Sequence, residues 1–268
     1  MAEMDRRAAL RNLLALAAGA LLPSSLRARG WRIRIGVLPG PDARVMKVVQ
    51  EAAAKHRLSV EIVVMRDPAR LNAAVNAGAL DANGCQDLPA LDADIAAHGH
   101  ELAAVAHTIT LPLAIYSKKV RSLRELKEGD TIALPDDRVD AARALVLLHN
   151  YGLLQLRDGA GLDAHTSDVT ANPRELVLVS IDSRRLARSL ANVTAAAMTY
   201  PFAEAAGLEP ARDSIAMEDG RSPYAHVLVT RTRDKSKPWV ATLVSACHSD
   251  AVGGFILTEF HDSVRRPW

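Results

Sequence analysis

The sequence predicts an α/β protein built from two lobes. Its 268 residues are more than one compact domain usually needs and suit two lobes, because domains run to roughly 100 to 200 residues. From residue 31 onward, apolar runs alternate with helical periodicity in the order strand, helix, strand, helix, strand. This order favours a parallel sheet with helices on its faces, and in such sheets ligands bind beyond the carboxyl ends of the strands.

The composition narrows the class of function. Apolar residues make up 49% of the chain, and its net charge is +2. The first 28 residues hold four arginines against two acidic residues, so the remainder carries about zero charge and no nucleic-acid partner is expected. The sequence contains no GxSxG, HExxH or P-loop motif. We therefore expect no enzyme, no cofactor and no metal site.

Residues 1–29 read as an export signal. Arg6 and Arg7 form a twin-arginine-like pair near the N-terminus. An apolar core follows at residues 13–22 and is too short to span a bilayer. The cleavage point stays open within residues 25–30. Because no cysteine lies near it, we expect a soluble periplasmic protein without a lipid anchor.

The first lobe is predicted from residues 30–117. Alternating or continuous apolar runs predict strands, and apolar residues at three-to-four-residue spacing predict helices. The expected strands are 31–38, 59–65 and 79–86, and the expected helices are 45–55, 70–77 and 88–98. Residues 101–117 continue as extended chain. The strand tips at 38–41, 66–68 and 83–87 are candidates for a pocket.

The second lobe is predicted from residues 118–222, and the stretch 111–148, which leads into it, organises the whole chain. An extended segment, 111–117, leads through a charged linker to the strand 131–134, and we expect these two strands in different lobes. The acidic turn at Asp136 and Asp137 then opens a helix. Free backbone N–H groups at a helix N-terminus attract anions, and Arg143 adds a planar fork suited to a carboxylate. A surface ion pair with the nearby aspartates is the alternative.

The chain then returns to the first lobe through residues 223–268. Strands are expected at 176–181, 194–198 and 224–230, and helices at 183–192 and 237–247. Two crossings between lobes form a two-segment hinge, which allows a ligand to be enclosed by closure.

These segments together resemble the methionine-binding lipoprotein family, the MetQ/NlpA group of ABC-importer substrate-binding proteins. The resemblance spans residues 33–231 and includes IGVLPGP at 35–41, ALDAN at 79–83, PLAIYSKK at 112–119, SLRELKEGDTIALPDD at 122–137 and SPYA at 222–225. It implies a bilobal type II periplasmic binding protein fold, an amino acid as ligand, typically methionine, and delivery to an ABC permease and ATPase complex.

The chain departs from the family at the residues that would contact the ligand. Methionine-binding members carry F-Q-H-x-P-Y after the A-N pair, where this chain has Cys85, Gln86, Asp87, Leu88, Pro89 and Ala90. The family's D-P-T-N-L-G-R becomes residues 137–143, which keeps Arg143 and replaces the asparagine by Asp140. A second ligand-holding asparagine becomes Thr199. Losing several aromatic contacts to a thioether weakens methionine binding by several kcal/mol, roughly.

The resemblance therefore implies a changed ligand. The candidate ligand-binding residues are Arg143, Asp140, Asp87, Cys85, Gln86 and Thr199. We expect Arg143 to bind a carboxylate, while Asp87 and Asp140 favour an amine or cationic group. The alternatives are that Asp140 only caps its helix and Asp87 faces water. The alternative functions are a scaffold protein with a vestigial or repurposed pocket, and a periplasmic enzyme.

Two smaller interpretations complete the sequence-based expectations. Cys85 and Cys247 lack CxxC spacing, and we favour buried free thiols, with a disulfide left open. His98 and His100, with His107 nearby in sequence, are interpreted as solvated loop residues rather than metal ligands, because zinc needs a further ligand close by.

Overall fold

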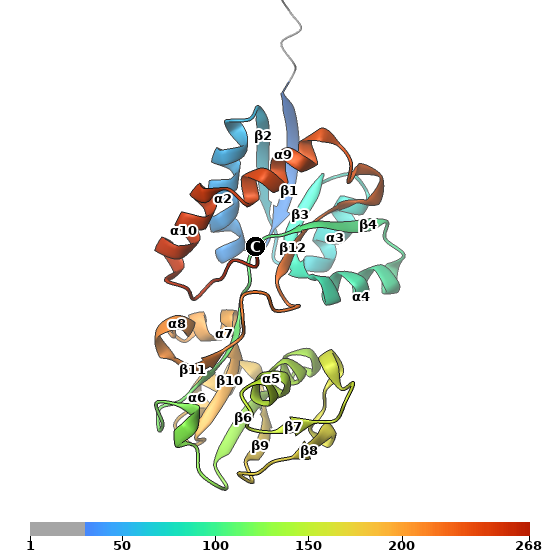
Figure 1. Ribbon diagram of the computed structural model, residues 1–268. Helices are drawn as coiled ribbons and strands as arrows, with labels where there is room; N and C mark the ends of the chain where they lie inside the picture. Colours follow the sequence, from blue (N-terminus) through green and yellow to red (C-terminus); the bar gives the residue numbers. More distant parts are fainter. Residues whose placement is uncertain (1–29) are drawn as a thin grey trace, which may run out of the picture. The chain divides into compact units, whose positions relative to one another are not determined.

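The structure is a computed structural model that describes residues 30–268. The predicted export signal and the expected absence of a lipid anchor concern the residues before this range, so they lie outside the described part of the chain. Within it, Figure 1 shows two separate sheets, each with its own helices.

The first sheet has five strands in the order β2, β1, β3, β12, β4. Strand β1 runs parallel to β3, with Ile35 opposite Ala82, whereas β12 is antiparallel to both β3 and β4. The predicted parallel sheet is therefore mixed. The strands are β1 (Trp31–Val37), β2 (Leu58–Val64), β3 (Ala82–Asp87), β4 (Leu102–His107) and β12 (His226–Arg231).

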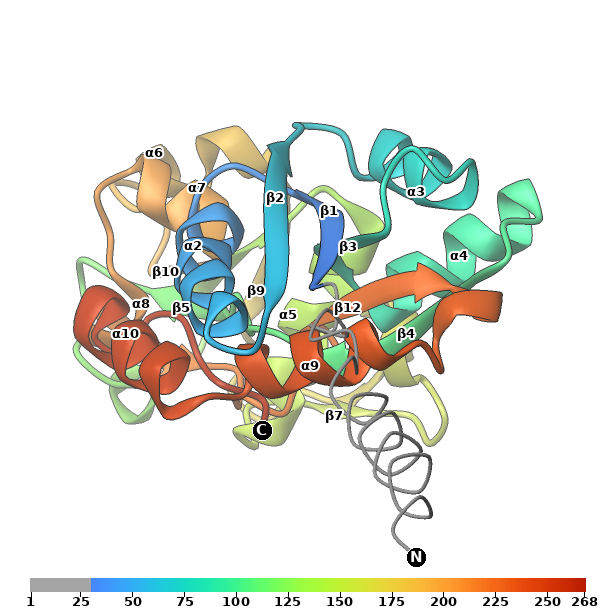
Figure 2. The same ribbon diagram turned by 90° about the horizontal axis from the view of Figure 1, so that it is seen from above.

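Helices cover both faces of this sheet, as Figures 1 and 2 show. One apolar cluster joins α2, α9 and α10 to one face, and another joins α3 and α4 to the other. Nearly all of β3 and the second half of β1 are therefore buried on both faces. The helices are α2 (Pro41–Ala54), α3 (Pro68–Asn76), α4 (Leu88–His98), α9 (Pro238–Cys247) and α10 (Asp250–Phe260).

The second sheet has the order β11, β5, β10, β6, β9. Strand β10 is antiparallel to β5 and parallel to β6, and β6 is parallel to β9. Side chains alternate: Leu113 and Ile115 join one cluster, while Ala114 and Tyr116 join the other. The strands are β5 (Leu113–Tyr116), β6 (Thr131–Pro135), β9 (Val177–Ile181), β10 (Ala195–Thr199) and β11 (Ser214–Met217).

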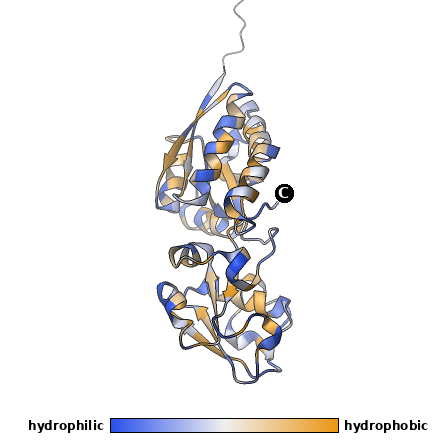
Figure 3. Ribbon diagram, turned by 90° about the vertical axis from the view of Figure 1, so that its left-hand side faces the viewer, coloured by the Kyte–Doolittle hydropathy of each residue, from blue (hydrophilic) through white to orange (hydrophobic). Residues whose placement is uncertain are grey.

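Helix α5 packs on one face of the second sheet and α6 and α7 on the other. Figure 3 shows apolar residues running along the strands of both sheets, with polar residues more frequent in the connections. The helices are α5 (Arg138–Asn150), α6 (Leu186–Ser189), α7 (Tyr200–Ala205) and α8 (Pro210–Asp213). A two-stranded ribbon of β7 (Gln155–Leu156) and β8 (Val169–Ala171) and five short 3-10 turns, η1 (Leu123–Glu125), η2 (Gly161–Asp163), η3 (Thr166–Asp168), η4 (Ser183–Arg185) and η5 (Thr232–Asp234), complete the described elements.

Strand β5 belongs to the second sheet, which changes one expectation. The sequence placed residues 111–117 in the first lobe and separated them from the strand at 131–134. The pairings of β10 with both β5 and β6 put these two strands in the same sheet. The chain therefore leaves the first sheet after β4 and crosses before Leu113, because β5 finds its hydrogen-bonding partners on β10 and β11.

The C-terminal tail contacts the crossing segment. Thr110 N–H donates to the Arg265 carbonyl at 2.8 Å, and Arg265 N–H donates back to the Thr110 carbonyl at 3.0 Å. Ala211 N–H donates to the Ser263 hydroxyl at 3.1 Å, which ties the tail to α8. The tail is thus a third segment beside the two crossings that the sequence predicts.

The segment Pro238–Phe260 is long and apolar enough to cross a membrane by length and composition. The structure divides it into α9 and α10, and the Ser249 hydroxyl caps α10 by accepting from Val252 N–H at 3.4 Å. Trp239, Leu243 and Ile256 are buried in the core of the first sheet. Both helices therefore act as core helices.

Several element boundaries differ from the sequence-based expectations. Helix α2 begins at Pro41, four residues before the expected start, because a proline fits the first helical position. The helix expected at 183–192 is only the turn η4 followed by the short α6. Helices α7, α8 and α10 and strand β11 were not predicted from the sequence.

Cys85 and Cys247 are buried free thiols, as predicted.

Candidate functional site

The N-terminus of α5 is occupied by the chain itself. The Asp137 carboxylate accepts from Val139 N–H at 2.9 Å and from Asp140 N–H at 3.0 Å. These are the N–H groups that the sequence assigned to a bound anion. Asp137, rather than Asp140, is therefore the helix cap, and the expected anion site at this terminus is filled.

Arg143 is buried and surrounded by acceptors. It lies one turn into α5, is 8% exposed, and directs its Nε and Nη2 edge at Glu218. Arg143 Nη2 donates to Glu218 Oε2 at 2.6 Å and Nε donates to Oε1 at 3.1 Å, a bidentate ion pair. Burial would lower the pKa of Arg143, but the hydrogen bonds and charge of Glu218 hold this pKa above its usual value.

The remaining donors of Arg143 are nearly used up. Nη2 also donates to the Leu111 carbonyl at 3.3 Å, and Nη1 donates to Asp140 Oδ1 at 3.4 Å. Four of the five guanidinium N–H groups therefore have partners, and the bond to Asp140 is long. A solute carboxylate can be bound at the Nη1 side without displacing Glu218.

Tyr224 forms an aromatic wall against Arg143. The Arg143 guanidinium carbon lies 4.3 Å from the centre of the Tyr224 ring, a cation–π contact. The Tyr224 hydroxyl is buried without a hydrogen-bond partner among the described residues, a condition it shares with Tyr116. Burial raises the pKa of Tyr224 to about 12, so this hydroxyl is a neutral group that can donate one hydrogen bond.

The surroundings of Asp140 disfavour the negative charge of its carboxylate. Burial raises its pKa, the nearby Arg143 lowers it, and the negative charges of Asp137 and Glu218 raise it further, so the net pKa lies above the usual value. Because Arg143 is already neutralised by Glu218, it does not fully compensate a second acid. A cation next to Asp140 would relieve this repulsion.

Asp87 and His226 bring a second group of charges to the site. Asp87 ends β3 and caps α4 by accepting from Ala90 N–H at 2.9 Å, while His226 begins β12 directly opposite it in register. His226 Nδ1 lies 2.9 Å from Asp42 Oδ1. Burial would lower the pKa of His226, but the charge and hydrogen bond of Asp42 hold it above the usual value.

These residues act on one another electrostatically. Asp87 contributes to the pKa values of Arg143, Tyr224 and His226, and Arg143 contributes to that of His226. The group holds four carboxylates, Asp42, Asp87, Asp140 and Glu218, against one guanidinium and one imidazole. Among these six side chains negative charge is in excess whether or not His226 is protonated, so their combined potential is negative.

The other predicted ligand-binding residues have different surroundings. Cys85 is 2% exposed and packs with Leu71 and Leu91 in the core, where burial raises the pKa of its thiol. The Gln86 side chain is paired with Asn72 through hydrogen bonds of 2.6 and 3.0 Å. Thr199 ends β10 and is 8% exposed. The structure brings together Arg143, Asp140 and Asp87, and it holds Cys85 and Gln86 in core contacts.

A hollow of about 350 Å³ borders part of this group. It is lined by Arg143, Glu218 and Tyr224, together with Tyr151 and Arg221, and Asp87 and Asp140 are not among its lining residues. Arg143, Glu218 and Tyr224 thus border this hollow, whereas Asp87 and Asp140 do not.

Sequence reasoning missed four residues of the site: Asp42, Glu218, Tyr224 and His226. Tyr224 belongs to a segment that the sequence singled out, and His226 follows it as a titratable residue at the start of an apolar strand. Asp42 directly follows the first strand tip. Glu218 carried no sequence signal, because its role depends on a fold that places it beside Arg143.

Comparisons with known proteins agree with this fold. The profile of the family described as NlpA lipoprotein matches residues 33–268. The D-methionine-binding lipoprotein MetQ of Escherichia coli strain K12 is 40% identical over 223 residues, which are 82% of this chain and 82% of the relative. Outer membrane lipoprotein 3 of Mannheimia haemolytica is 38% identical over 255 residues, 95% of this chain and 97% of the relative.

Solved structures extend the comparison. A nutrient-binding protein from Burkholderia cenocepacia bound to methionine is 38% identical, covers 88% of this chain and 100% of its own, and superposes with a TM-score of 0.73. A periplasmic substrate-binding protein of an ABC transporter from Coxiella burnetii is 37% identical, with 87% and 99% coverage and the same TM-score of 0.73. The bilobal α/β fold is confirmed, as is a general solute-binding role rather than an enzymatic one.

Proposed function

Because the chain belongs to the NlpA lipoprotein family, we propose that it captures an amino acid or related small carboxylate in the periplasm and delivers it to the permease and ATPase of an ABC importer. The solute binds between the two lobes, at the group formed by Asp87, Asp140 and Arg143. The relatives with methionine in their names supply the amino-acid class, and the charges of this chain change its preference.

The observation that carries the proposal is the excess of carboxylates around a single arginine. Glu218 neutralises Arg143, and Asp140 keeps a raised pKa despite its contact with that arginine. A bound cationic or amine group would offset the repulsion among Asp140, Asp87 and Glu218. The solute we propose is therefore an amino acid with a positively charged side chain, held by its cationic group at Asp87 and Asp140.

Arg143 and Tyr224 complete the proposed binding mode. The one unused N–H of Arg143 and the unpartnered hydroxyl of Tyr224 both donate, which suits a carboxylate acceptor. A bond to a charged group contributes about 1.5 to 3 kcal/mol, roughly 10-fold to 150-fold in affinity. The absence of the family's aromatic residues at Cys85, Asp87 and Ala90 is consistent with the loss of a thioether pocket.

Titration calorimetry with matched probes tests the proposal. L-Arginine and L-lysine should bind at least tenfold more tightly than L-methionine, and a diamine without a carboxylate should bind more weakly than either. Asp87→Asn is the sharpest variant, because asparagine still caps α4 and only the charge is removed. It should lower affinity for the cationic amino acids and leave the melting temperature nearly unchanged.

Arg143→Ala tests the carboxylate contact, with Arg221→Ala as its control, since Arg221 is exposed and its ion-pair partner within residues 30–268 is Asp219. Affinity should fall at least tenfold in the first variant and stay constant in the second. Tighter binding of methionine than of any cationic amino acid, or unchanged affinity in both Asp87→Asn and Arg143→Ala, would exclude the proposed binding mode.

A further inference from the structure

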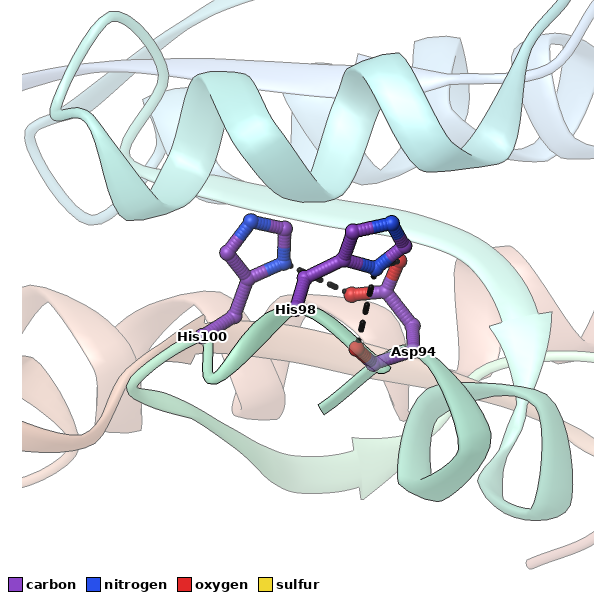
Figure 4. Close-up of side chains that lie close together, drawn as sticks. All are labelled: Asp94, His98 and His100. Atoms are coloured by element: carbon purple, nitrogen blue, oxygen red, sulfur yellow. Dashed lines mark hydrogen bonds and ion pairs between the residues drawn. The ribbon is translucent and has the colours of Figure 1, made fainter. Parts of the chain in front are cut away.

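A cluster of two histidines and one aspartate lies at the C-terminal end of α4, away from the residues of the proposed solute site. Asp94 and His98 are one helical turn apart, so their side chains share a face of the helix. Gly99 then adopts a left-handed conformation with φ of 66° and ends the helix. This reversal returns His100 to the same carboxylate, as Figure 4 shows.

The two imidazoles approach opposite oxygens of Asp94. His100 Nδ1 lies 2.8 Å from Asp94 Oδ2, and His98 Nδ1 lies 3.3 Å from Asp94 Oδ1. The rings are stacked, with centroids 5.3 Å apart and planes inclined by 18°. The ligand atoms of all three residues lie within 4.8 Å of one another.

These separations fit a tetrahedral metal ion. With bonds of about 2.0 to 2.1 Å from zinc to nitrogen or oxygen, neighbouring ligand atoms are about 3.3 Å apart. The His98–Asp94 distance already has this value, and the His100–Asp94 distance is shorter, but the two distances end on different oxygens of Asp94. Rotation of the side chains must therefore bring both nitrogens to one ion, and His98 Nδ1 must give up its 3.1 Å contact with the Asp94 backbone carbonyl. Two imidazoles and one carboxylate are three protein ligands, which leaves a fourth position for water.

The surroundings lack a permanent positive charge. The Asp94 side chain is only 10% exposed, and among residues 30–268 its ion-pair partners are the two histidines, with no lysine or arginine. A divalent ion would neutralise this carboxylate, and its place at the end of α4 is favourable because the C-terminus of a helix carries partial negative charge. His98, 54% exposed, leaves the cluster open to solvent.

We propose that Asp94, His98 and His100 form a binding site for a divalent transition-metal ion, Zn²⁺ above all. Imidazole and carboxylate together suit zinc, whereas calcium and magnesium prefer oxygen ligands alone. The site stabilises the end of α4, whose other end carries Asp87 of the proposed solute site. The expectation from sequence, that these histidines are solvated loop residues, is the alternative, and the experiment below decides between the two.

Zinc titration of the untagged protein, followed by calorimetry without any solute, tests this site. One Zn²⁺ should bind per chain, and affinity should fall as the pH drops and the imidazoles become protonated. His98→Asn should weaken zinc binding at least about 100-fold, the upper end of the effect of losing an outer-shell partner, and His100→Asn should do the same. His56→Asn is the control, because His56 is an exposed histidine outside the cluster.

His98 keeps the experiment interpretable, since an exposed side chain can be replaced without loss of the fold. Anomalous diffraction at the zinc edge should place the ion among Asp94, His98 and His100. Zinc binding that persists in both His98→Asn and His100→Asn, or no binding by the original protein at neutral pH, would overturn the proposal. The cluster would then be a pair of histidine–aspartate hydrogen bonds and nothing more.

Discussion

Arg143 and Arg231 are two buried arginines with the same exposed fraction, but their hydrogen-bonding and charged neighbours differ. Each is 8% exposed, and each donates four hydrogen bonds. Arg231 ends β12, and its Nη1 donates to the backbone carbonyls of Val75 at 2.8 Å and Leu80 at 2.6 Å. It ties the end of α3 and the following loop to the first sheet.

The acidic side chains beside the two arginines have pKa values that are shifted in opposite directions. Asp234 pairs with both Arg231 and Lys237, and although burial raises its pKa, its hydrogen bonds to Lys237 and Arg231 lower it below the usual value. Asp140 shares Arg143 with Glu218, and its pKa is raised. Both arginines are thus buried and ion-paired. Arg143 differs because its acidic neighbours outnumber its basic ones, and for this reason we assign it to function.

Replacing Arg231 should have the largest effect on stability. Arg231→Met removes the hydrogen bonds to the Val75 and Leu80 carbonyls and breaks the buried ion pair with Asp234, and breaking a buried ion pair costs about 3 to 5 kcal/mol. Urea unfolding measures this loss. Solute preference in the folded fraction should not change, and a changed preference would remove the distinction between the two arginines.

The His226–Asp42 pair should make stability depend on pH. Since the pKa of His226 is raised in the folded protein, the folded state holds the proton more firmly than the unfolded state does. Its stabilising contribution, about 1 to 3 kcal/mol for a charged hydrogen bond, is complete below the usual histidine value of 6.5 and disappears as the pH rises through the raised pKa.

Urea unfolding of the original protein and of His226→Asn measures this contribution. The difference in unfolding free energy should be larger at pH 6 than at pH 9. A difference that is constant over this range would show that the proton on His226 does not contribute, and the site would lose one of its charges.

Asp140→Asn should make the protein slightly more stable and a poorer binder. The raised pKa means that ionised Asp140 is unfavourable in the folded state, so removing its charge at pH 7 should raise the unfolding free energy by a few tenths to about 1 kcal/mol. Affinity for cationic amino acids should fall in the same variant. Thermal unfolding with and without solute records both effects, and a loss of stability would contradict the repulsion we describe.

Tyr224→Phe should have the smallest effect on stability. The Tyr224 hydroxyl has no partner among the described residues, so its removal should change the unfolding free energy by less than about 0.5 kcal/mol. If the hydroxyl donates to the solute, affinity should fall about tenfold in calorimetry. Tyr116→Phe is the matched control, because it removes the other unpartnered hydroxyl and should leave solute affinity unchanged.

Local sequence patterns predicted most of the first sheet and part of the candidate site. Alternation and apolar runs placed β1, β2 and β3 to within a few residues, and the position of Arg143 in the first turns of a helix is a local property. The sheet to which β5 belongs was predicted wrongly, because pairing with β10 is a contact between residues about eighty positions apart. Such pairings leave no trace in the periodicity of either strand.

Residue patterns alone predicted an α/β chain, an arginine in the first turns of the helix that became α5, and acidic candidates at Asp87 and Asp140. The folded chain added three facts: Asp137 caps α5, Glu218 neutralises Arg143, and His226 lies opposite Asp87. Each of these outcomes depends on the distance between charges from separate segments. Because electrostatic energy depends on that distance and on burial, it is settled when the chain folds.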